Sequence, residues 1–254
     1  MFRIDTTNSI IYVSRDGVNF TTALTDVAFV SPTNIVKFDV NFYGVAGADG
    51  QFWWTKDGGA NWVQVRPADS AETDFLQICY NKGQDRLWSI GANTGATNDV
   101  VEYSDDKGKT FTAVTTTAPV DLFGRLFCAD HATFAVIDHD LYVTQCDAVG
   151  SATDLAQRSI VGADGFITGI GSCDPKDCNF LWLTTTDADD VGHIYTSIDG
   201  GLNWAPETLP ASLTLVASPN INPVACCHSV DGDKVIFGFG LRLFQTDALD
   251  SFFE

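Results

Sequence analysis

Glutamate and positive charge are both scarce in this chain. Only four of its 33 acidic residues are Glu, so 29 are Asp, and the 14 Lys and Arg residues leave a formal net charge of −19. Because the short Asp carboxylate bonds its own backbone in turns, this balance indicates an all-β protein rather than helices with charged faces. The negative charge repels phosphate backbones and anionic lipid headgroups, so we expect no nucleic acid partner and no membrane insertion. Cationic groups, neutral glycans and proteins remain as partners.

Long apolar runs are missing as well. No stretch approaches the ~18 apolar residues of a membrane helix. The N-terminal sequence MFRIDTTNSIIYVS also lacks the basic segment and apolar run of a secretion signal, so we expect assembly in the cytoplasm. With 45% hydrophobic and 19% charged residues over 254 positions, the composition is that of a globular protein with a large core.

Cysteine forms no regular framework. The number of Cys residues, seven, is odd, and Cys79 and Cys128 lie in apolar, strand-like runs that predict buried thiols. Cys173 and Cys178 would close a small loop in an oxidising medium, and the sequence leaves open whether they pair. No set of cysteines has the ligand spacing of a zinc site, so we expect no metal and no cofactor.

One motif recurs three times in full along the chain. Its copies are TKDGGANW at 55–62, SDDKGKTF at 104–111 and SIDGGLNW at 197–204, and each reads Ser/Thr-x-Asp-x-Gly-x-x-aromatic. A fourth copy, SRDGVNF at 14–20, is one residue shorter. Short apolar or alternating runs precede and follow every copy, a pattern that predicts a strand, a turn and a second strand.

Two further segments keep the preceding strand and lose the motif. They are LYVTQ at 141–145 and LRLFQT at 241–246, so Ser or Thr anchors stand at 14, 55, 104, 144, 197 and 246, at intervals of 40 to 53 residues. A four-stranded propeller blade takes ~40–50 residues. Six anchors therefore predict six blades in a single domain over 1–254, with approximate bounds 1–25, 26–68, 69–117, 118–162, 163–212 and 213–254.

These motifs resemble the Asp-box, or bacterial neuraminidase repeat, β-propeller family. That family includes sialidases, sortilin-type receptors, some glycoside hydrolases and a photosystem assembly factor. The resemblance covers the whole chain as a repeat pattern. It implies a β-propeller in which each box forms the turn between the third and fourth strands of a blade, and with the six anchors it predicts an all-β, six-bladed β-propeller of Asp-box repeats. It does not extend to any one member's catalytic set.

The box also has a physical explanation. Its Asp carboxylate can accept hydrogen bonds from turn N–H groups, its Ser or Thr hydroxyl can support that carboxylate, and its Gly can take a positive φ. Its closing aromatic side chain is expected to pack between blades. We therefore expect the following box residues to be structural: Ser14, Asp16, Phe20, Thr55, Asp57, Gly59, Trp62, Ser104, Asp106, Gly108, Phe111, Ser197, Asp199, Gly201 and Trp204.

The two ends of the chain depart from the repeat. Only the strand-like runs FRID, IIYVS and FTTAL precede the second blade, and the sixth blade ends soon after its turn, in SFFE. We therefore expect the first blade to be short or to be completed by the C-terminus. A short blade would leave an edge that a neighbouring chain could cover.

Arg3 is the basis of one enzymatic hypothesis. The tetrapeptide Phe2-Arg3-Ile4-Asp5 resembles the Phe-Arg-Ile-Pro motif of sialidases, whose Arg binds the sialic acid carboxylate. Its last residue differs, however, and the first box follows only 11 residues later. A retaining sialidase also needs three converging Arg residues, an acid/base Asp and a Tyr nucleophile paired with Glu, and this set is incomplete. We therefore expect Arg3 to be a strand-end charge, a weak binding candidate at most, and the protein not to be an enzyme.

Two other features suggest ligand binding. Asp187, Asp189 and Asp190 cluster in one predicted loop and could bind Ca²⁺, but the glycine and distal Glu of a calcium loop are absent, so we expect a solvated loop. Trp53 and Trp54 could form a glycan platform. Adjacent strand residues point to opposite faces, and both faces of a blade are buried, so the pattern predicts two core residues instead.

The expected role is that of a subunit in a larger assembly. A Met-initiated chain without a signal peptide, built as a rigid propeller with an irregular edge, suits a non-catalytic structural or binding protein. We expect a virion component, such as a phage capsid decoration or tail-associated protein, that is assembled in the host cytoplasm and contacts other structural proteins or surface glycans. The alternative is an intracellular assembly factor or scaffold of the photosystem type. A sialidase-like glycoside hydrolase is the third possibility.

Overall fold

The computed structural model describes residues 1–24, 31–68, 73–93, 99–114, 125–129, 132–137, 140–144, 156–158, 166–171, 179–186, 192–206, 225–229, 232–239 and 242–247. These residues form strands joined by turns and contain no helix, which confirms the all-β prediction for the described part of the chain. Over the same residues, no helix is long and apolar enough to cross a membrane.

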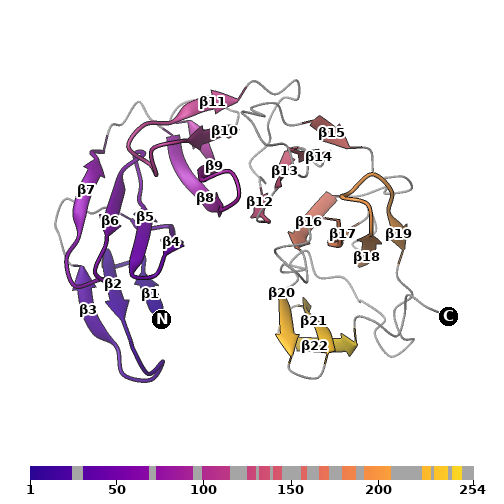
Figure 1. Cartoon of the computed structure of the whole chain (residues 1–254), viewed down its shortest axis with the longest axis horizontal. Coiled ribbons are helices and arrows are strands. Elements are labelled where there is room, and N and C mark those ends of the chain that lie inside the picture. Colours follow the sequence, from indigo (N-terminus) through magenta and orange to yellow (C-terminus); the bar gives the residue numbers. More distant parts are fainter. Residues whose placement is uncertain are drawn as a thin grey trace. The chain divides into compact units, whose positions relative to one another are not determined.

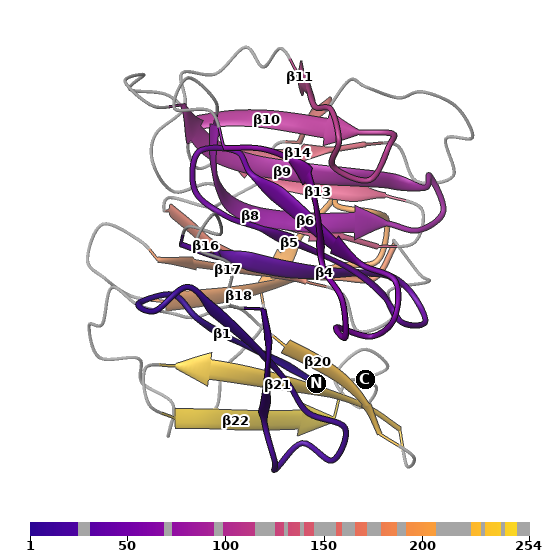
Figure 2. The ribbon, with the colours of Figure 1, turned by 90° about the vertical axis from the view of Figure 1, so that its left-hand side faces the viewer.

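The strands of the described residues form six antiparallel sheets, each built from strands that are consecutive in the sequence (Figure 1). The first sheet holds β1 (Phe2–Asp5), β2 (Ile10–Val13) and β3 (Thr21–Leu24). The second holds β4 (Asn34–Asp39), β5 (Phe42–Ala46), β6 (Phe52–Thr55) and β7 (Val63–Arg66). The third holds β8 (Thr73–Asn81), β9 (Arg86–Asn93), β10 (Asp99–Ser104) and β11 (Thr112–Val114). In Figure 2, β8, β9 and β10 lie side by side.

The other three sheets follow the same order. The fourth sheet holds β12 (Arg125–Cys128), β13 (Thr133–Ile137), β14 (Asp140–Val143) and β15 (Ala156–Arg158). The fifth holds β16 (Phe166–Gly171), β17 (Leu181–Thr186), β18 (Gly192–Ser197) and β19 (Ala205–Pro206). The sixth holds β20 (Ala225–Ser229), β21 (Gly232–Phe239) and β22 (Arg242–Asp247). Each sheet lies inside one of the six intervals that the repeat predicts.

The boxes fix the position of each strand within its sheet. In the second, third and fifth sheets the box follows the third strand and precedes the fourth. In the first sheet the box follows β2, which is only the second strand, so the counterpart of β4 is absent from the described residues. This is the short first blade that the sequence predicts. Completion by the C-terminus concerns residues 248–254, which lie outside the described residues.

The chain divides into two compact units, 1–126 and 127–254, and the boundary falls inside β12. In the first unit, Ile11, Val45 and Trp53 join the first and second sheets in one buried cluster. A second cluster, which includes Phe52 and Phe75, joins the second and third sheets. The single domain and the blade count stay predictions.

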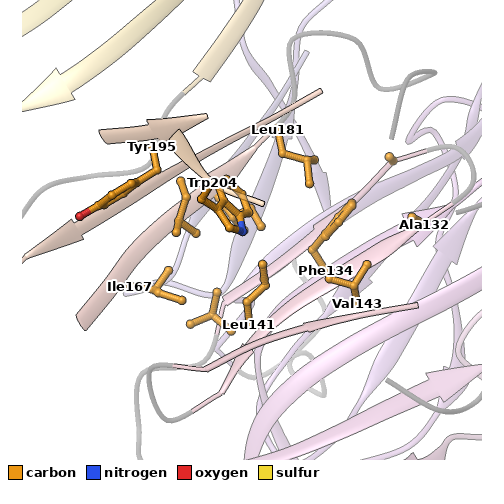
Figure 3. Packing of buried hydrophobic residues seen from close by; sticks show 12 residues of the cluster. Ala132, Phe134, Leu141, Val143, Ile167, Leu181, Tyr195 and Trp204 are labelled. Atoms are coloured by element: carbon orange, nitrogen blue, oxygen red, sulfur yellow. The ribbon is translucent and has the colours of Figure 1, made fainter. Parts of the chain in front are cut away.

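Among the described residues of the second unit, a large core cluster lies between the fourth and fifth sheets. Figure 3 shows its side chains, with Phe134 and Leu141 from the fourth sheet and Leu181 and Trp204 from the fifth. Leu141 and Leu181 are fully buried, and Trp204 is 8% exposed. Burial of this apolar surface stabilises the packing of the fourth sheet against the fifth.

Candidate functional site

The box turns close on themselves through a hydroxyl and a carboxylate. In the second box, the Thr55 hydroxyl donates to Asp57 Oδ1 at 2.8 Å and accepts the Gly59 N–H at 2.8 Å. Asp57 also accepts the backbone N–H of Asn61 at 2.9 Å and its side-chain amide at 2.6 Å. Gly59 has a φ of 99°, which disfavours any side chain, and a Cβ there would lie 2.9 Å from the Phe2 ring.

The other three boxes repeat this geometry. Ser14, Ser104 and Ser197 each donate to their Asp at 2.8 Å. The hydroxyl of Ser104 accepts the Gly108 N–H at 2.7 Å, and that of Ser197 accepts the Gly201 N–H at 2.9 Å. The first box is one residue shorter, and its Ser14 hydroxyl accepts the N–H of Gly17, three residues later, at 2.8 Å.

The hydroxyl and the carboxylate occupy different environments. In the second, third and fifth sheets the N–H that the hydroxyl accepts is buried. The N–H groups that the carboxylate accepts are exposed, as at Leu202 and Asn203 around Asp199. The anchor hydroxyl therefore satisfies the buried part of the turn, and the Asp carboxylate orders its solvent side.

The box carboxylates are held in their ionised form. Hydrogen bonds from Asn61 and Thr55 lower the pKa of Asp57 to about 2, and bonds from Asn19, Val18 and Ser14 lower the pKa of Asp16. At Asp106 and Asp199, burial acts in the opposite direction, but hydrogen bonds within the turn outweigh it and lower both pKa values. A carboxylate with a low pKa is a poor proton donor or acceptor near neutral pH, so these Asp residues are unsuited to acid–base catalysis.

The closing aromatic side chains pack toward the preceding sheet. The Trp62 ring lies 6.1 Å from the Phe2 ring of the first sheet, and the Phe111 ring lies 6.3 Å from the Phe52 ring of the second. Trp204 of the fifth sheet belongs to the cluster with fourth-sheet residues. Phe20 is half-buried.

Thr144 is a Ser/Thr anchor that no box follows, and its hydroxyl makes a different hydrogen bond. Thr144 is fully buried and its Oγ1 accepts the N–H of Thr133 at 2.7 Å, while its own N–H donates to the Thr133 carbonyl at 2.9 Å. The hydroxyl therefore binds the start of the neighbouring strand β13 in place of a turn.

Arg3 and Asp5 lie at the first hairpin. Arg3 is exposed, with its guanidinium carbon 5.8 Å from the centre of the Tyr12 ring. Asp5, which replaces the Pro of the sialidase motif, accepts the N–H groups of Thr7 and Asn8 and so closes the β1–β2 turn. Hydrogen bonds from Asn8 lower the pKa of Asp5.

Two other arginines of the first unit have separate structural surroundings. Arg86 is 7% exposed and binds Asp105 through Nε at 2.7 Å. The Arg66 guanidinium lies 5.0 Å from the Phe111 ring centre. Over the described residues, no group of three or more His, Cys, Asp or Glu side chains could hold a metal ion.

Several expectations from the sequence need correction or lie outside the described residues. Trp53 is buried as predicted, but Trp54 is half-buried because it sits at the solvent edge, where Lys56 and Lys109 cover its ring at 5.2 and 5.1 Å. Cys79 and Cys128 are half-buried and each is disulfide-bonded, so neither is the buried thiol that its sequence context predicts. The residues that lie outside are Cys173, Cys178, Asp187, Asp189 and Asp190.

A crevice of about 750 Å³ lies between the first and second sheets, beside the first and second boxes. Its apolar lining includes Phe2, Val13 and Tyr43, and the Phe2 and Tyr43 rings meet edge to face at 4.7 Å. Its charged side chains are those of Arg15, Asp16 and Asp57. Reasoning from the sequence missed this site, because a crevice depends on which side chains of two sheets face each other.

The chain is similar to solved structures, although no family model and no curated protein matches it. YCF48 from Cyanidioschyzon merolae is 13% identical with a TM-score of 0.64, and the match covers 94% of this chain and 72% of that one. The GH74 xyloglucanase from Xanthomonas campestris is 16% identical with a TM-score of 0.66, over 99% of this chain and 45% of that one. A chain in a crystal structure of the mitotic checkpoint complex is 14% identical with a TM-score of 0.60, over 94% of this chain and 71% of that one.

These similarities extend over nearly the whole chain. Because the sequence identities are low, the similarities are evidence for the fold alone. Hairpin-built sheets of three or four strands that follow one another along the sequence are the repeating unit of such folds. The all-β chain described here has the fold of a β-propeller.

Proposed function

We propose that the protein is a non-catalytic binding propeller that acts as an assembly factor or scaffold for other proteins. The observation that carries this proposal is the match to YCF48, which spans most of both chains. The match to the xyloglucanase covers less than half of that enzyme. A propeller in the mitotic checkpoint complex gives a second case of this architecture within a protein assembly. In the terms of the family resemblance, this is the role of the photosystem assembly-factor type in an Asp-box propeller.

The chemistry of the boxes supports a role without catalysis. Every box carboxylate is bonded within its own turn, as Asp57 is to Thr55 and Asn61. A glycosidase needs two carboxyl groups whose environments push their pKa values apart, one of them upward. The four box Asp residues have lowered pKa values, so they offer no such pair.

The virion hypothesis requires the same kind of protein contact and differs in where the protein acts. It is tested together with the scaffold proposal, by isolating the protein from its source with chemical cross-linking and identifying the cross-linked chains by mass spectrometry. A stoichiometric complex with other intracellular proteins is expected. A complex with capsid or tail proteins would select the virion instead, and recovery of the uncomplexed protein alone would contradict both.

The glycosidase hypothesis has its own test. The purified protein is incubated with a fluorogenic sialoside and a panel of aryl glycosides, beside an Arg3→Ala variant. We expect no hydrolysis of these substrates above the rate measured in buffer without protein. Turnover that the Arg3→Ala variant loses would show a sialidase-like site at the first hairpin and overturn the non-catalytic proposal.

A further inference from the structure

The boxes place Asp directly before Gly, which is a chemically sensitive pair. The residue after the box Asp takes a positive φ, which Gly adopts most readily. The sequence contains six Asp-Gly pairs, and three of them lie in boxes, at 16–17, 57–58 and 199–200. Their glycines have φ values of 75°, 73° and 71°, whereas the third box has Lys107 at this position, with a φ of 59°. Gly therefore avoids backbone strain in these turns and creates the sensitive pair.

Asp-Gly pairs isomerise because Gly has no side chain to hinder attack by its backbone nitrogen. The Gly nitrogen forms a bond to the carboxyl carbon of the Asp side chain, and the carboxyl hydroxyl leaves with the nitrogen's proton as one water molecule. Water then opens this cyclic imide at either carbonyl and gives Asp again or isoaspartate, in which the main chain runs through the side-chain carbonyl. The reaction needs a neutral carboxyl group, an accessible Gly nitrogen and a side chain that can turn toward it.

The carboxyl groups of the box Asp residues are held in place. Asp57 Oδ1 accepts the Thr55 hydroxyl at 2.8 Å and the Asn61 N–H at 2.9 Å, and its Oδ2 accepts the Asn61 side-chain amide at 2.6 Å. Asp199 has the same arrangement, with Asn203 donating to Oδ1 at 2.9 Å and to Oδ2 at 2.6 Å. Each carboxyl group has to give up these bonds before its carbon can reach the Gly nitrogen.

The attacking nitrogens are engaged as well. The Gly58 N–H donates to the carbonyl oxygen of Asn41 at 3.0 Å, and the Gly200 N–H donates to that of Asn179 at 3.0 Å. In the shorter first box, the Gly17 N–H donates to the Ser14 hydroxyl at 2.8 Å. Both partners of the reaction are therefore hydrogen-bonded in all three pairs.

The carboxyl groups are also ionised, which removes the reactive form. Hydrogen bonds from Asn61 and Thr55 lower the pKa of Asp57 from 3.8 to about 2, so the neutral fraction near neutral pH falls about tenfold or more. Hydrogen bonds within their own turns lower the pKa values of Asp16 and Asp199 too.

We propose that the hydrogen bonds of the boxes protect these three Asp-Gly pairs from spontaneous isomerisation to isoaspartate. The bonds that close each turn also block the reaction at the carboxyl carbon and at the Gly nitrogen. Isoaspartate would lengthen the main chain of the turn by one methylene group and so displace the N–H groups that the carboxylate binds. The inference is independent of what the propeller binds.

The test compares the full chain with octapeptides that have the box sequences TKDGGANW and SIDGGLNW but no fold. Both are incubated for weeks at physiological temperature and mildly acidic pH. Isoaspartate is measured by enzymatic methylation with a protein-isoaspartate methyltransferase, and peptide mapping assigns its position. We expect Asp57 and Asp199 to isomerise about tenfold or more slowly in the folded chain than in the peptides. Equal rates in the chain and the peptides would overturn the proposal.

Two variants separate the box bonds from the general effect of folding. Asn61→Ala removes the side-chain bond to Asp57 Oδ2 and should raise isomerisation at Asp57 about threefold, with Asp199 in the same molecule as the unchanged control. Asn203→Ala should have the converse effect. An equal rise at both positions would assign the effect to loosening of the whole fold, and unchanged rates in both variants would show that the bonds do not protect. Either result contradicts the proposal.

The third box allows the protection to be tested on a new pair. Lys107→Gly creates a fourth Asp-Gly pair in a turn where Asp106 already accepts the N–H groups of Lys109 and Thr110. We expect Asp106 in this variant to isomerise as slowly as Asp57 and Asp199. Isomerisation as fast as in the octapeptide SDDGGKTF would show that the box bonds do not suffice.

Discussion

The indole Nε1 of Trp54 donates a hydrogen bond of 2.7 Å to the carbonyl oxygen of Lys107, 53 residues later in the chain. This bond connects the second sheet to the turn of the third box, next to the place where Gly108 packs against the Phe52 ring. Lys107 takes a positive φ of 59° in that turn. A residue just before one box therefore helps to hold the backbone of the next.

The Trp54 bond can be tested by substitution. Trp54→Phe keeps an aromatic ring beside Lys56 and Lys109 but removes the donor, so we expect the free energy of unfolding to fall by about 1 kcal/mol. Urea denaturation measures this change. Lys37→Gln, at an exposed side chain of β4, is the control and should shift stability by less than ~0.5 kcal/mol. Equal effects of the two changes would mean that the bond does not contribute.

In the box at 197–204, the Ser197 hydroxyl should contribute more to stability than the Asp199 carboxylate. Ser197→Ala leaves the buried N–H of Gly201 without an acceptor, at a cost of ~1–3 kcal/mol. Asp199→Ala leaves the N–H groups of Leu202 and Asn203 exposed to water, which replaces the lost acceptor. We therefore expect the free energy of unfolding to fall by about 1 kcal/mol or less. Thermal melts of both variants decide the order, and a larger loss for Asp199→Ala would reverse this assignment.

Trp204 should be among the most sensitive positions of the second unit. Its side chain is 8% exposed, so Trp204→Ala opens a cavity beside Leu141 and Leu181 and should reduce stability by ~3–5 kcal/mol. Ile198→Ala, in the same box, removes a side chain that is 71% exposed and should change stability by less than ~0.5 kcal/mol. Calorimetry of the pair measures both changes, and similar melting temperatures for the two variants would contradict the packing described here.

Acid should destabilise the protein through the box carboxylates. The folded pKa of Asp57, about 2, lies below its ordinary value of 3.8, so its contribution is complete above that ordinary value and is lost as pH falls through about 2. The melting temperature of the wild type should therefore drop between pH 4 and pH 2. Asp57→Asn should start lower and drop less over that interval. Parallel curves for the two proteins would show that Asp57 does not contribute.

The cysteines give a prediction that needs no substitution. Because Cys79 and Cys128 are each disulfide-bonded, titration of the unfolded, unreduced protein should find at most five of the seven thiols. Reduction should raise the number to seven. Peptide mapping under non-reducing conditions identifies the residues that pair. Seven thiols before reduction would show that both cysteines are reduced.

The repeat predicted the strand order well because each box forms a turn between two strands. One strand ends where the box begins and the next begins where it ends, so the hairpins β2–β3, β6–β7, β10–β11 and β18–β19 lie where the motif predicts them. The three strands of the first sheet were also visible, since the strand-like runs FRID, IIYVS and FTTAL correspond to β1, β2 and β3. The order and position of the strands are therefore predictable from local sequence.

Features that depend on facing sheets could not be predicted. Trp53 and Trp54 alternate between faces, as expected, but the solvent edge that leaves Trp54 half-buried is set by the neighbouring box. The crevice requires Val13 to lie near residues 57–60 of the second box. The disulfide bonding of Cys79 and that of Cys128 depend likewise on contacts that sequence spacing does not show. Asp5 also shows a limit, because a motif resemblance obscured its simple turn-closing role.

The boxes have a consequence for the order of folding events. Every hydrogen bond that closes the box at 197–204 joins residues no more than four positions apart. These bonds can therefore form before distant parts of the chain come together. Hairpins of this kind form in ~1–10 μs, whereas contacts between residues far apart in sequence carry a larger loop-closure entropy and form more slowly. We therefore expect the box hairpins to be present in the transition state, and the packing of one sheet on the next to be the slow step.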